Sequence, residues 1–506
     1  IIVKRRSFIK NTTATAAAAY ISPFLWNANS QIKDNLHNPM IGIQVGAVSF
    51  YDEGVKTVLD NVQNLAGVNT LFIPVYAYNR GLAGRQIPGE PFPDHGKQVS
   101  DEDFVGGYYA TMHDKYYKNS IYKPEHARAP ELGKFDVLAE VIPEAHKRRM
   151  RVIAFFADNF GKERPHSDEL CEYDIYGKNT GQVNLINPDY RNFVKAVTED
   201  CIRSYPIDGL LWRTERTGPL SNTLGFNHYG KMGEPNPTSF DVHTIQFAQK
   251  KGINIERVKE GYFKLIELIM DIRNDKKPVD GCYVTFQRLT MEYPEILAWH
   301  QTAVDILRDT YKMIYTFSKD IQKDLPVGWA LSFKGMYNPY YRARQDLQEL
   351  GKYSDFMKIV MYTNVGGVRF HTFTRYATQS IYGDMMPQEA LAFISAIMGY
   401  QPLNFKTIRQ TGLPTEIVYK ETLRAMKGAK GTPMNVWPAI DIDVPARRFG
   451  MKNPSYAKRT AKSVKEDVKA VFRGGAKGII LARKYSEMNL SNLQGVGMAL
   501  DELNIK

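Results

Sequence analysis

Eight short apolar runs recur along the chain, and segments with helical periodicity lie between them. The runs span residues 40–50, 69–78, 151–158, 209–215, 327–333, 355–364, 434–443 and 478–487. Parallel strands that are covered by helices on both faces are apolar along their whole length, as these runs are. Eight such strands, each followed by a helix, predict an α/β fold of the (β/α)₈ TIM barrel type.

The segments between the runs support this interpretation. Residues 135–149 and 188–205 carry apolar side chains at spacings of three and four, and residues 253–322 are mostly helical in pattern. No low-complexity linker divides the chain, so we expect one barrel domain over residues 38–506. The 506 residues exceed the usual barrel length of about 250, which predicts long loop insertions after strand 2 (79–133) and after strand 4.

The alternative fold is an open doubly wound sheet. It is disfavoured because no G-x-G-x-x-G turn follows the first run and no P-loop occurs in the chain.

The N-terminal segment, residues 1–30, is basic and then weakly apolar. Arg5 and Arg6, followed by Phe8, Ile9 and Lys10, match a twin-arginine export signal, and the apolar stretch after them is too short for a membrane span. A basic, frayed terminus is the alternative. We therefore expect export through the twin-arginine pathway to a periplasmic or extracellular location. The net charge is +12, but the basic residues are scattered along the chain and the sequence contains no nucleic-acid-binding motif. No nucleic-acid partner is therefore predicted.

Polar residues gather where the predicted strands end, which is where TIM barrels carry their active sites. Because side chains alternate along a strand, residues two apart share a face. This parity groups Arg213 with Glu215, Asp441 with Asp443, and Tyr362 with Asn364. It also groups Arg483, Tyr485 and Glu487, while Asp158, Lys334, Tyr76 and Tyr78 lie at three further strand ends.

Acidic residues thus end strands 3, 4, 7 and 8, with arginines beside them. One acid at a strand end is commonly a helix cap or half of a salt bridge. Four acids in one barrel mouth raise each other's pKa values, and neighbouring arginines lower them, so one carboxyl can stay protonated while another stays ionised. A buried ion-pair network that fixes a loop to the barrel is the alternative.

The predicted site residues form two groups. The catalytic candidates are Glu215, Asp441, Glu487 and Asp443. The substrate-binding candidates are Arg213, Arg216, Asp158, Tyr76, Tyr78, Tyr362, Asn364, Lys334, Trp437, Arg483 and Tyr485. Aromatic side chains belong to the second group because their faces stack on the C–H faces of sugars. No H-E-x-x-H, cysteine cluster or G-x-S-x-G motif occurs, so neither a metal nor another cofactor is predicted.

Four stretches resemble a group of exported bacterial proteins. They are QVNLINPDYRNFV (182–194), IDGLLWRTERTGPL (207–220), VWPAIDIDVP (436–445) and GIILARKYSEMNLSNLQGVG (478–497). The resemblance covers about residues 40 to 500 and implies a glycoside-hydrolase-like (β/α)₈ barrel. Several relatives carry a C-x-C-x-x-C stretch after strand 4. The matching residues 237–254 contain no cysteine, so a metal or disulfide role of that stretch does not carry over.

These observations predict a glycosidase that acts on an oligosaccharide or polysaccharide. Two carboxyl groups flank the bond to be cleaved in such enzymes. Glu215 is expected to be the general acid/base and Asp441 the nucleophile or base, with Glu487 and Asp443 as rivals for the second role. Two alternatives stay open: a sugar-binding barrel without activity, and a lyase or isomerase that acts on an acidic sugar held by Arg213 and Arg483.

Overall fold

A computed structural model describes residues 39–78, 80–158, 160–228, 232–445 and 456–505. The predicted signal segment, residues 1–30, lies outside these described residues. Within them, no helix combines the length and the apolar character that a membrane crossing requires.

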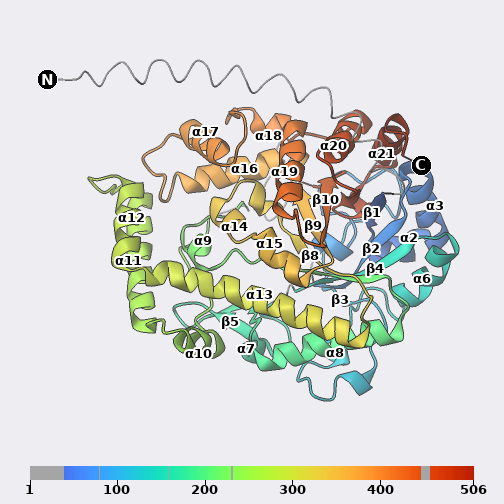
Figure 1. The fold of residues 1–506 in the computed structure, drawn as a ribbon, viewed down its shortest axis with the longest axis horizontal. Helices are drawn as coiled ribbons and strands as arrows, with labels where there is room; N and C mark the ends of the chain where they lie inside the picture. Colours follow the sequence, from blue (N-terminus) through green and yellow to red (C-terminus); the bar gives the residue numbers. More distant parts are fainter. Residues whose placement is uncertain (1–38, 79, 159, 229–231, 446–455, 506) are drawn as a thin grey trace.

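Eight parallel strands close into a barrel (Figure 1), which confirms the predicted fold class. The sheet runs in the order β1-β11-β10-β9-β8-β7-β4-β2, and pairing between β1 and β2 closes it. The barrel strands are β1 (Met40–Gln44), β2 (Thr70–Ala77), β4 (Arg151–Ala157), β7 (Gly209–Arg213), β8 (Val327–Leu331), β9 (Phe356–Met361), β10 (Asn435–Asp441) and β11 (Gly478–Ala482).

Buried side chains explain why these segments form strands. Every residue of β2, β8, β9 and β11 is buried, as expected for strands covered on both faces. Rings from three strands meet in the barrel core: Phe356 stacks on Trp437 at 4.4 Å between ring centroids, and Phe72 meets both rings edge-on. Gly328 leaves room for this cluster, because a Cβ there would lie 2.4 Å from the Phe356 ring.

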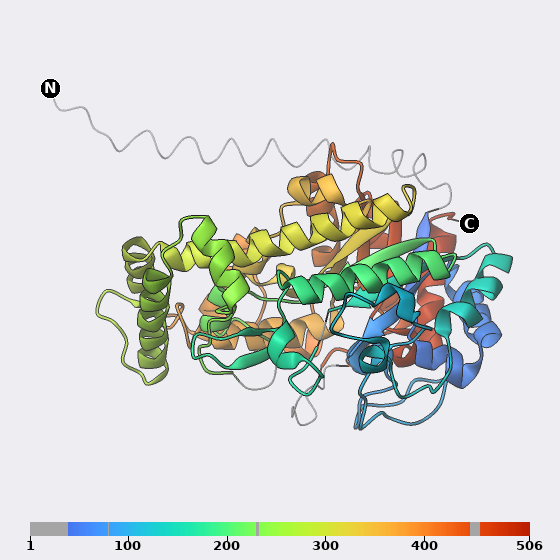
Figure 2. The same cartoon turned by 90° about the horizontal axis from the view of Figure 1, so that it is seen from below.

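Helices surround the barrel (Figures 1 and 2). The helices that follow strands are α2 (Ala47–Glu53), α3 (Val55–Ala66), α6 (Val137–Lys147), α8 (Pro188–Ser204), α13 (Glu295–Ile321), α16 (Asn364–Ala377), α17 (Pro387–Ile397), α19 (Thr415–Gly428), α20 (Ala461–Arg473) and α21 (Leu490–Glu502). The longest, α13, lies alongside α8 in both views. The Asn187 side chain begins α8 by accepting hydrogen bonds from the N–H groups of Asp189 and Tyr190, which the N-P-D sequence favours.

Shorter elements fill the long connections. Between β2 and α6 lie α4 (Arg80–Ala83), β3 (Gly107–Tyr108), η1 (Asp114–Tyr116) and α5 (Pro124–Ala127). Between β7 and α13 lie α9 (Pro219–Thr223), α10 (Val242–Lys250), α11 (Ile255–Arg273) and α12 (Cys282–Glu292). The remaining elements are α7 (Ser167–Leu170), β5 (Cys171–Tyr173), β6 (Asn179–Val183), η2 (Phe333–Met336), α14 (Pro339–Ala343), α15 (Leu347–Leu350), η3 (Gly351–Tyr353), α18 (Ile408–Thr411) and η4 (Tyr485–Glu487). The β5–β6 hairpin between β4 and α8 was not predicted.

Several strands end earlier than the sequence pattern predicts. The strand that begins at Gly478 stops at Ala482, and Tyr485–Glu487 form a 3₁₀ turn. Strand β9 ends at Met361, because helix α16 begins at Asn364. Strand parity therefore does not apply to the polar residues beyond these ends, and their positions must come from the contacts they make.

Candidate functional site

Two adjoining cavities open at the carboxyl ends of the barrel strands. The first, here called the mouth cavity, has a volume of about 20 Å³ and is lined by Gly81, Leu82, Arg213, Glu215, Phe333, Tyr362, Arg369 and Arg483. The second, here called the Asp443 cavity, has a volume of about 160 Å³, and its lining includes Glu90, Phe92, Asn364, Asp443, Tyr456 and Glu487. Residues predicted from the sequence thus line both cavities.

An ion pair forms the wall between the two cavities. Arg483 lines the mouth cavity, Glu487 lines the Asp443 cavity, and the Arg483 Nε donates to Glu487 Oε2 at 2.8 Å. The Glu487 side chain is fully buried, and Lys484 lies 3.5 Å from its other oxygen. Glu487 thus has two cationic partners and no exposed side-chain surface, whereas the Glu215 side chain is 18% exposed, which disfavours Glu487 as the nucleophile.

The mouth cavity is rich in positive charge. Arg213 forms an ion pair with Glu215, and the side chains of both are 18% exposed. Arg369 lies over the Phe333 ring at 4.0 Å and over the Tyr362 ring at 5.3 Å. Three guanidinium groups and one carboxylate therefore line the same small space.

Two lysines lie behind this cavity. The Lys334 ammonium donates to the Glu215 backbone carbonyl at 2.7 Å and to the Thr217 hydroxyl at 3.1 Å. Burial lowers the pKa of Lys334 to about 8. Burial also lowers the pKa of Lys358, which lies on β9 inside the barrel, well below its usual value. The negative charge of Glu215 opposes the lowering of the pKa in both lysines. Lys334, a predicted substrate ligand, thus holds the backbone of the Glu215 loop and does not line the mouth cavity.

The Asp443 carboxyl lies in a different electrostatic setting. Burial raises its pKa to about 6, although it accepts hydrogen bonds from the Asn489 N–H at 2.9 Å and from the Asn492 amide at 2.9 and 3.0 Å. The same cavity contains the Asn364 side chain, whose buried Oδ1 has no hydrogen-bond partner. The amide nitrogen of Asn364 donates to the Val444 carbonyl at 3.3 Å, which fixes the orientation of that side chain.

Asp441 does not fit the predicted role of nucleophile. Its side chain has no exposed surface, and its two oxygens accept the backbone N–H groups of Thr363 and Asn364 at 2.9 and 3.0 Å. Burial raises its pKa, while Arg459 opposes the shift. Asp441 therefore ties the end of β10 to the end of β9, and its oxygens are closed to a substrate.

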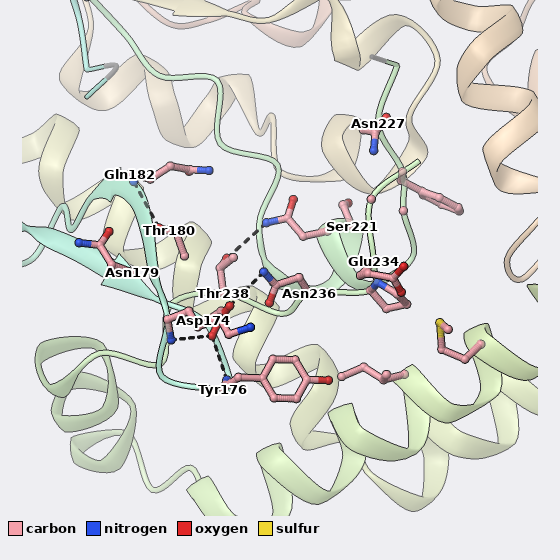
Figure 3. Close-up of a pocket in the computed structure, with 18 of the residues that line it drawn as sticks. Asp174, Tyr176, Asn179, Thr180, Gln182, Ser221, Asn227, Glu234, Asn236 and Thr238 are labelled. Carbon is pink, nitrogen blue, oxygen red and sulfur yellow. Dashed lines mark hydrogen bonds between the residues drawn. The ribbon is translucent and has the colours of Figure 1, made fainter. Parts of the chain in front are cut away.

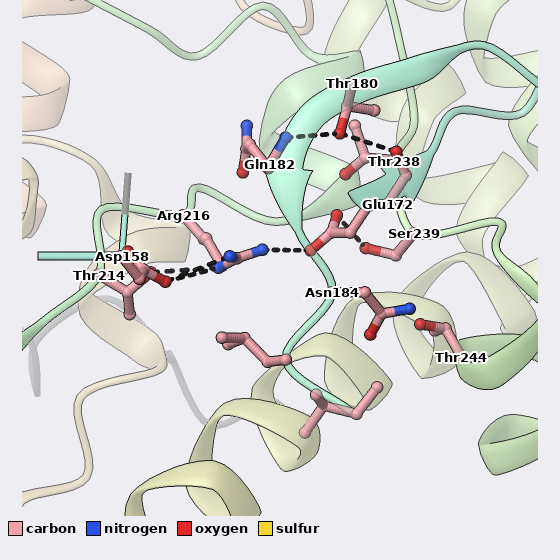
Figure 4. Close-up of polar contacts among 12 residues, drawn as sticks. Asp158, Glu172, Thr180, Gln182, Asn184, Thr214, Arg216, Thr238, Ser239 and Thr244 are labelled. Carbon is pink, nitrogen blue, oxygen red and sulfur yellow. Dashed lines mark hydrogen bonds and ion pairs between the residues drawn. The ribbon is translucent and has the colours of Figure 1, made fainter. Parts of the chain in front are cut away.

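Arg216 and Asp158, two predicted substrate ligands, bind each other instead (Figure 4). Arg216 Nε and Nη2 donate to one Asp158 oxygen at 3.3 and 3.2 Å, and Nη1 donates to Glu172 on β5. The Ser239 hydroxyl donates to the other Glu172 oxygen at 2.9 Å. This network joins the end of β4, the loop after β7 and the β5–β6 hairpin, which is the arrangement that the ion-pair alternative predicts.

Four predicted aromatic ligands lie in the protein core. Tyr76 packs on Phe193 of α8, and the Tyr78 hydroxyl lies 2.6 Å from the Tyr122 hydroxyl. Trp437 stacks in the barrel interior near the start of β10, away from the mouth. The Tyr485 hydroxyl accepts from Asn61 and donates to Glu53. All four rings are buried, and none of them lines the mouth cavity or the Asp443 cavity.

A large polar groove lies outside the barrel mouth (Figure 3). It has a volume of about 780 Å³ and runs between the β5–β6 hairpin, α9 with the segment after it, and α11. Amides and hydroxyls dominate its lining: Asn179, Thr180, Gln182, Ser221, Asn222, Asn227, Asn236 and Thr238. The Tyr176 ring, 54% exposed, also lines it, and the Asn236 Oδ1 is buried without a hydrogen-bond partner.

The loop after β7 connects the groove to the mouth. Glu215 lines the mouth cavity and Ser221 lines the groove, six residues further along the chain. Six residues span at most about 22 Å, so both sites lie within reach of one short saccharide chain. Arg344 holds this loop by donating to the carbonyls of Arg216 and Thr217 at 2.7 and 2.8 Å.

Three residues at or near the site were not predicted from the sequence: Arg369, Lys358 and Glu172. Arg369 lies in NVGGVRF, where a charged residue interrupts a run of small and apolar residues, and that interruption is a usable signal. Lys358 likewise interrupts the apolar run DFMKIVM within β9. Glu172 carries no such signal, because the β5–β6 hairpin has weak strand periodicity.

No sequence family model and no curated protein matches this chain. Solved structures do match it. The β-galactosidase from the psychrophilic Marinomonas ef1 superposes with a TM-score of 0.51 at 10% sequence identity, covering 92% of this chain and 59% of that chain. The PgaB (BpsB) glycoside hydrolase domain from Bordetella bronchiseptica superposes with a TM-score of 0.48 at 11% identity, covering 92% of this chain and 99% of that chain. At such identities the likeness concerns the fold alone, a (β/α)₈ barrel.

Proposed function

We propose that this chain is a glycoside hydrolase that cleaves an oligosaccharide or polysaccharide at the barrel mouth. One observation carries the proposal: two carboxyl groups at the mouth lie in opposite electrostatic settings. Positive charge surrounds Glu215, whereas burial raises the pKa of Asp443 to about 6. Pairs of carboxyls whose pKa values are pushed apart are typical of acid/base catalysis.

The proposed roles follow from these settings. Asp443 is the general acid that protonates the leaving oxygen, because its raised pKa keeps a proton available near pH 6. Glu215 is the base or nucleophile, because its carboxylate lines the mouth cavity and is ion-paired with Arg213 there. This assignment reverses the role expected for Glu215 and replaces Asp441 by Asp443 as its partner. The substrate would lie across the Arg483–Glu487 wall between the two cavities.

The groove supports a saccharide as the substrate class. Neutral amides and hydroxyls suit sugar hydroxyl groups, and the exposed Tyr176 ring can stack on a sugar face. We propose that a longer substrate extends from the mouth into the groove. We also propose that the enzyme works outside the cytoplasm, on the basis of Arg5 and Arg6 in the N-terminal segment.

A screen of aryl glycosides and polysaccharides tests the proposed activity. The native protein is expected to release the aryl group or reducing ends from at least one substrate, and the Glu215→Gln protein is expected to be inactive on it. Equal release by both proteins would contradict the role of Glu215. A complete absence of release, with sugar binding retained, would favour the sugar-binding alternative.

A second candidate function is elimination on an acidic sugar. The three arginines of the mouth cavity favour it, because a lyase must neutralise the sugar carboxylate before a base can remove the adjacent proton. The two functions give different products. A lyase yields an unsaturated sugar that absorbs in the ultraviolet, whereas a hydrolase consumes water and yields no such absorbance.

The pKa of Asp443 predicts the pH dependence of the reaction. A general acid acts in its protonated form, and the fraction of protonated Asp443 falls as the pH rises through about 6. We therefore expect kcat/KM to decrease above pH 6. For the Asp443→Asn enzyme, kcat/KM is expected no longer to decrease above pH 6. This variant is also expected to lose most of its activity on substrates with poor leaving groups. A native profile that is flat between pH 5 and 8 would exclude Asp443 as the acid.

Replacing Tyr176 by Ala tests the groove. Loss of one ring face costs about 1 kcal/mol of binding free energy, or roughly a fivefold increase in KM, for substrates long enough to reach it. KM for an aryl monoglycoside is expected to stay unchanged, as is kcat for both. Tyr51→Ala serves as the matched control, since Tyr51 is 53% exposed on α2 and does not line the groove. An equal KM change in both variants would contradict the proposal that longer substrates bind in the groove.

A further inference from the structure

The Arg369 guanidinium lacks a counter-ion within the described part of the chain. The residue lies on α16 and is 5% exposed, and its Nη1 is buried without a hydrogen-bond partner. Its neighbours are the faces of the Phe333 and Tyr362 rings, at 4.0 and 5.3 Å from the guanidinium carbon. No carboxylate of the described residues lies within ion-pair distance of it. The other two arginines of the mouth cavity do form ion pairs, Arg213 with Glu215 and Arg483 with Glu487.

A buried guanidinium without a counter-ion is costly. Arginine does not lose its proton in proteins, so it cannot escape the cost of burial by becoming neutral, as a lysine can. Contacts with the two ring faces recover part of this cost. They do not satisfy the buried Nη1, whose N–H donors lie at the edge of the guanidinium. A side chain kept in this state is expected to have a partner that arrives with the ligand.

The charges of the mouth cavity indicate which partner that is. Glu215 pairs with Arg213 and Glu487 pairs with Arg483, so Arg369 supplies the uncompensated positive charge. The cavity volume of about 20 Å³ admits about one water molecule. A space of this size is too small for a sugar ring and admits only the end of a substituent, such as one oxygen of an anionic group. The Asp443 cavity, with about 160 Å³, lies on the other side of the Arg483–Glu487 wall.

We propose that the mouth cavity binds the anionic substituent of an acidic sugar and that Arg369 is its principal ligand. This inference rests on the proposed function and narrows the substrate class to saccharides with a carboxylate or sulfate group. The sugar ring that carries the group would lie where the two cavities meet, with its anionic substituent against Arg369 and its glycosidic bond between Glu215 and Asp443. Arg213 and Arg483 keep their ion pairs with Glu215 and Glu487, while Arg369 gains the anionic group of the substrate as its partner.

Direct binding measurements on the full chain test this inference. The probes are D-glucuronate and D-galacturonate, their neutral matches D-glucose and D-galactose, and D-glucose 6-sulfate. At least one acidic sugar is expected to bind the native protein more tightly than its neutral match in calorimetry. Comparing the carboxylated sugars with the sulfated one identifies which anion the cavity prefers.

Variants on α16 assign the effect to Arg369. Arg369→Gln is expected to weaken binding of the acidic sugar at least about tenfold and to leave binding of the neutral sugar unchanged, since a charge-assisted hydrogen bond is lost. Arg369→Lys, which keeps the charge, is expected to restore part of the affinity. Arg375→Gln is the matched control, because Arg375 is exposed on the same helix. The melting temperature of Arg369→Gln is expected to be unchanged or raised, because no ion pair is broken.

Two results would overturn the inference: equal binding of acidic and neutral sugars, or native-like binding of an acidic sugar by Arg369→Gln. A marked drop in the melting temperature of that variant would assign Arg369 a structural role. These outcomes are independent of catalysis. Binding that depends on Arg369 without any cleavage would refute the proposed function alone, and cleavage of neutral saccharides without any preference for anions would refute this inference alone.

Discussion

Replacing Glu215 by Gln is expected to reduce kcat about 10³-fold while substrate binding is retained. Gln keeps the size and shape of the side chain but can neither accept a proton nor attack a sugar carbon, and losses of this order are typical when a catalytic carboxylate is removed. Glu215 is paired with Arg213 at the mouth, so the neutral side chain keeps a contact with the guanidinium. Initial rates and calorimetric binding, both on the substrate identified by screening, measure the two quantities.

Glu256→Gln is the control for this experiment. The Glu256 side chain on α11 is 84% exposed and lines neither the mouth cavity nor the groove, so its replacement is expected to leave kcat within a factor of about two. If Glu215→Gln keeps more than a tenth of native kcat, Glu215 is not a catalytic residue and the proposed mechanism is wrong.

Replacing Arg216 by Met is expected to lower the free energy of unfolding by about 3–5 kcal/mol. The change leaves Asp158 and Glu172 without their common cation in a buried setting, and it breaks the link between β4, the loop after β7 and the β5–β6 hairpin. Burial already raises the pKa of Glu172, and Arg216 opposes that shift. A folded pKa above the unfolded value costs stability as the pH rises, so the destabilisation is expected to be larger at pH 8 than at pH 4.

Urea unfolding at both pH values measures this effect. Arg288→Met is the matched control, because its ion pair with Asp280 is more than half exposed and is expected to contribute less than about 1 kcal/mol. Adding Glu172→Gln to Arg216→Met is expected to recover part of the lost stability. If Arg216→Met is as stable as native protein but binds substrate poorly, Arg216 is a substrate ligand, as the sequence pattern first indicated.

The barrel was predictable because its signal repeats. Runs such as 69–78 and 434–443 are apolar over a strand's length, and helical segments follow them, so eight units are recognisable even where single boundaries are wrong. Strand ends were less predictable. Tyr485 and Glu487 continue the alternation of the last run, yet the chain turns after Ala482, because local turns compete with strand extension.

The site was predictable only in part, because its contacts join distant segments. Glu215 and Asp443 were named from their places at strand ends, and both line cavities at the mouth. Nothing in the sequence pairs Arg216 with Glu172, 44 residues earlier, or aims the oxygens of Asp441 at two backbone N–H groups. Such partners depend on loop geometry, which hydrophobic periodicity does not encode.

The most direct test of the account compares the Asp443→Asn and Glu215→Gln enzymes on two glycosides of the same sugar, one with a dinitrophenyl and one with a methyl leaving group. A dinitrophenolate leaves without a proton, so Asp443→Asn is expected to keep most of its activity on that glycoside and to lose about 10²–10⁴-fold on the other. Glu215→Gln is expected to lose activity on both. Equal losses by Asp443→Asn on the two glycosides, or native activity of either variant on both, would contradict the assignment of these two carboxyls.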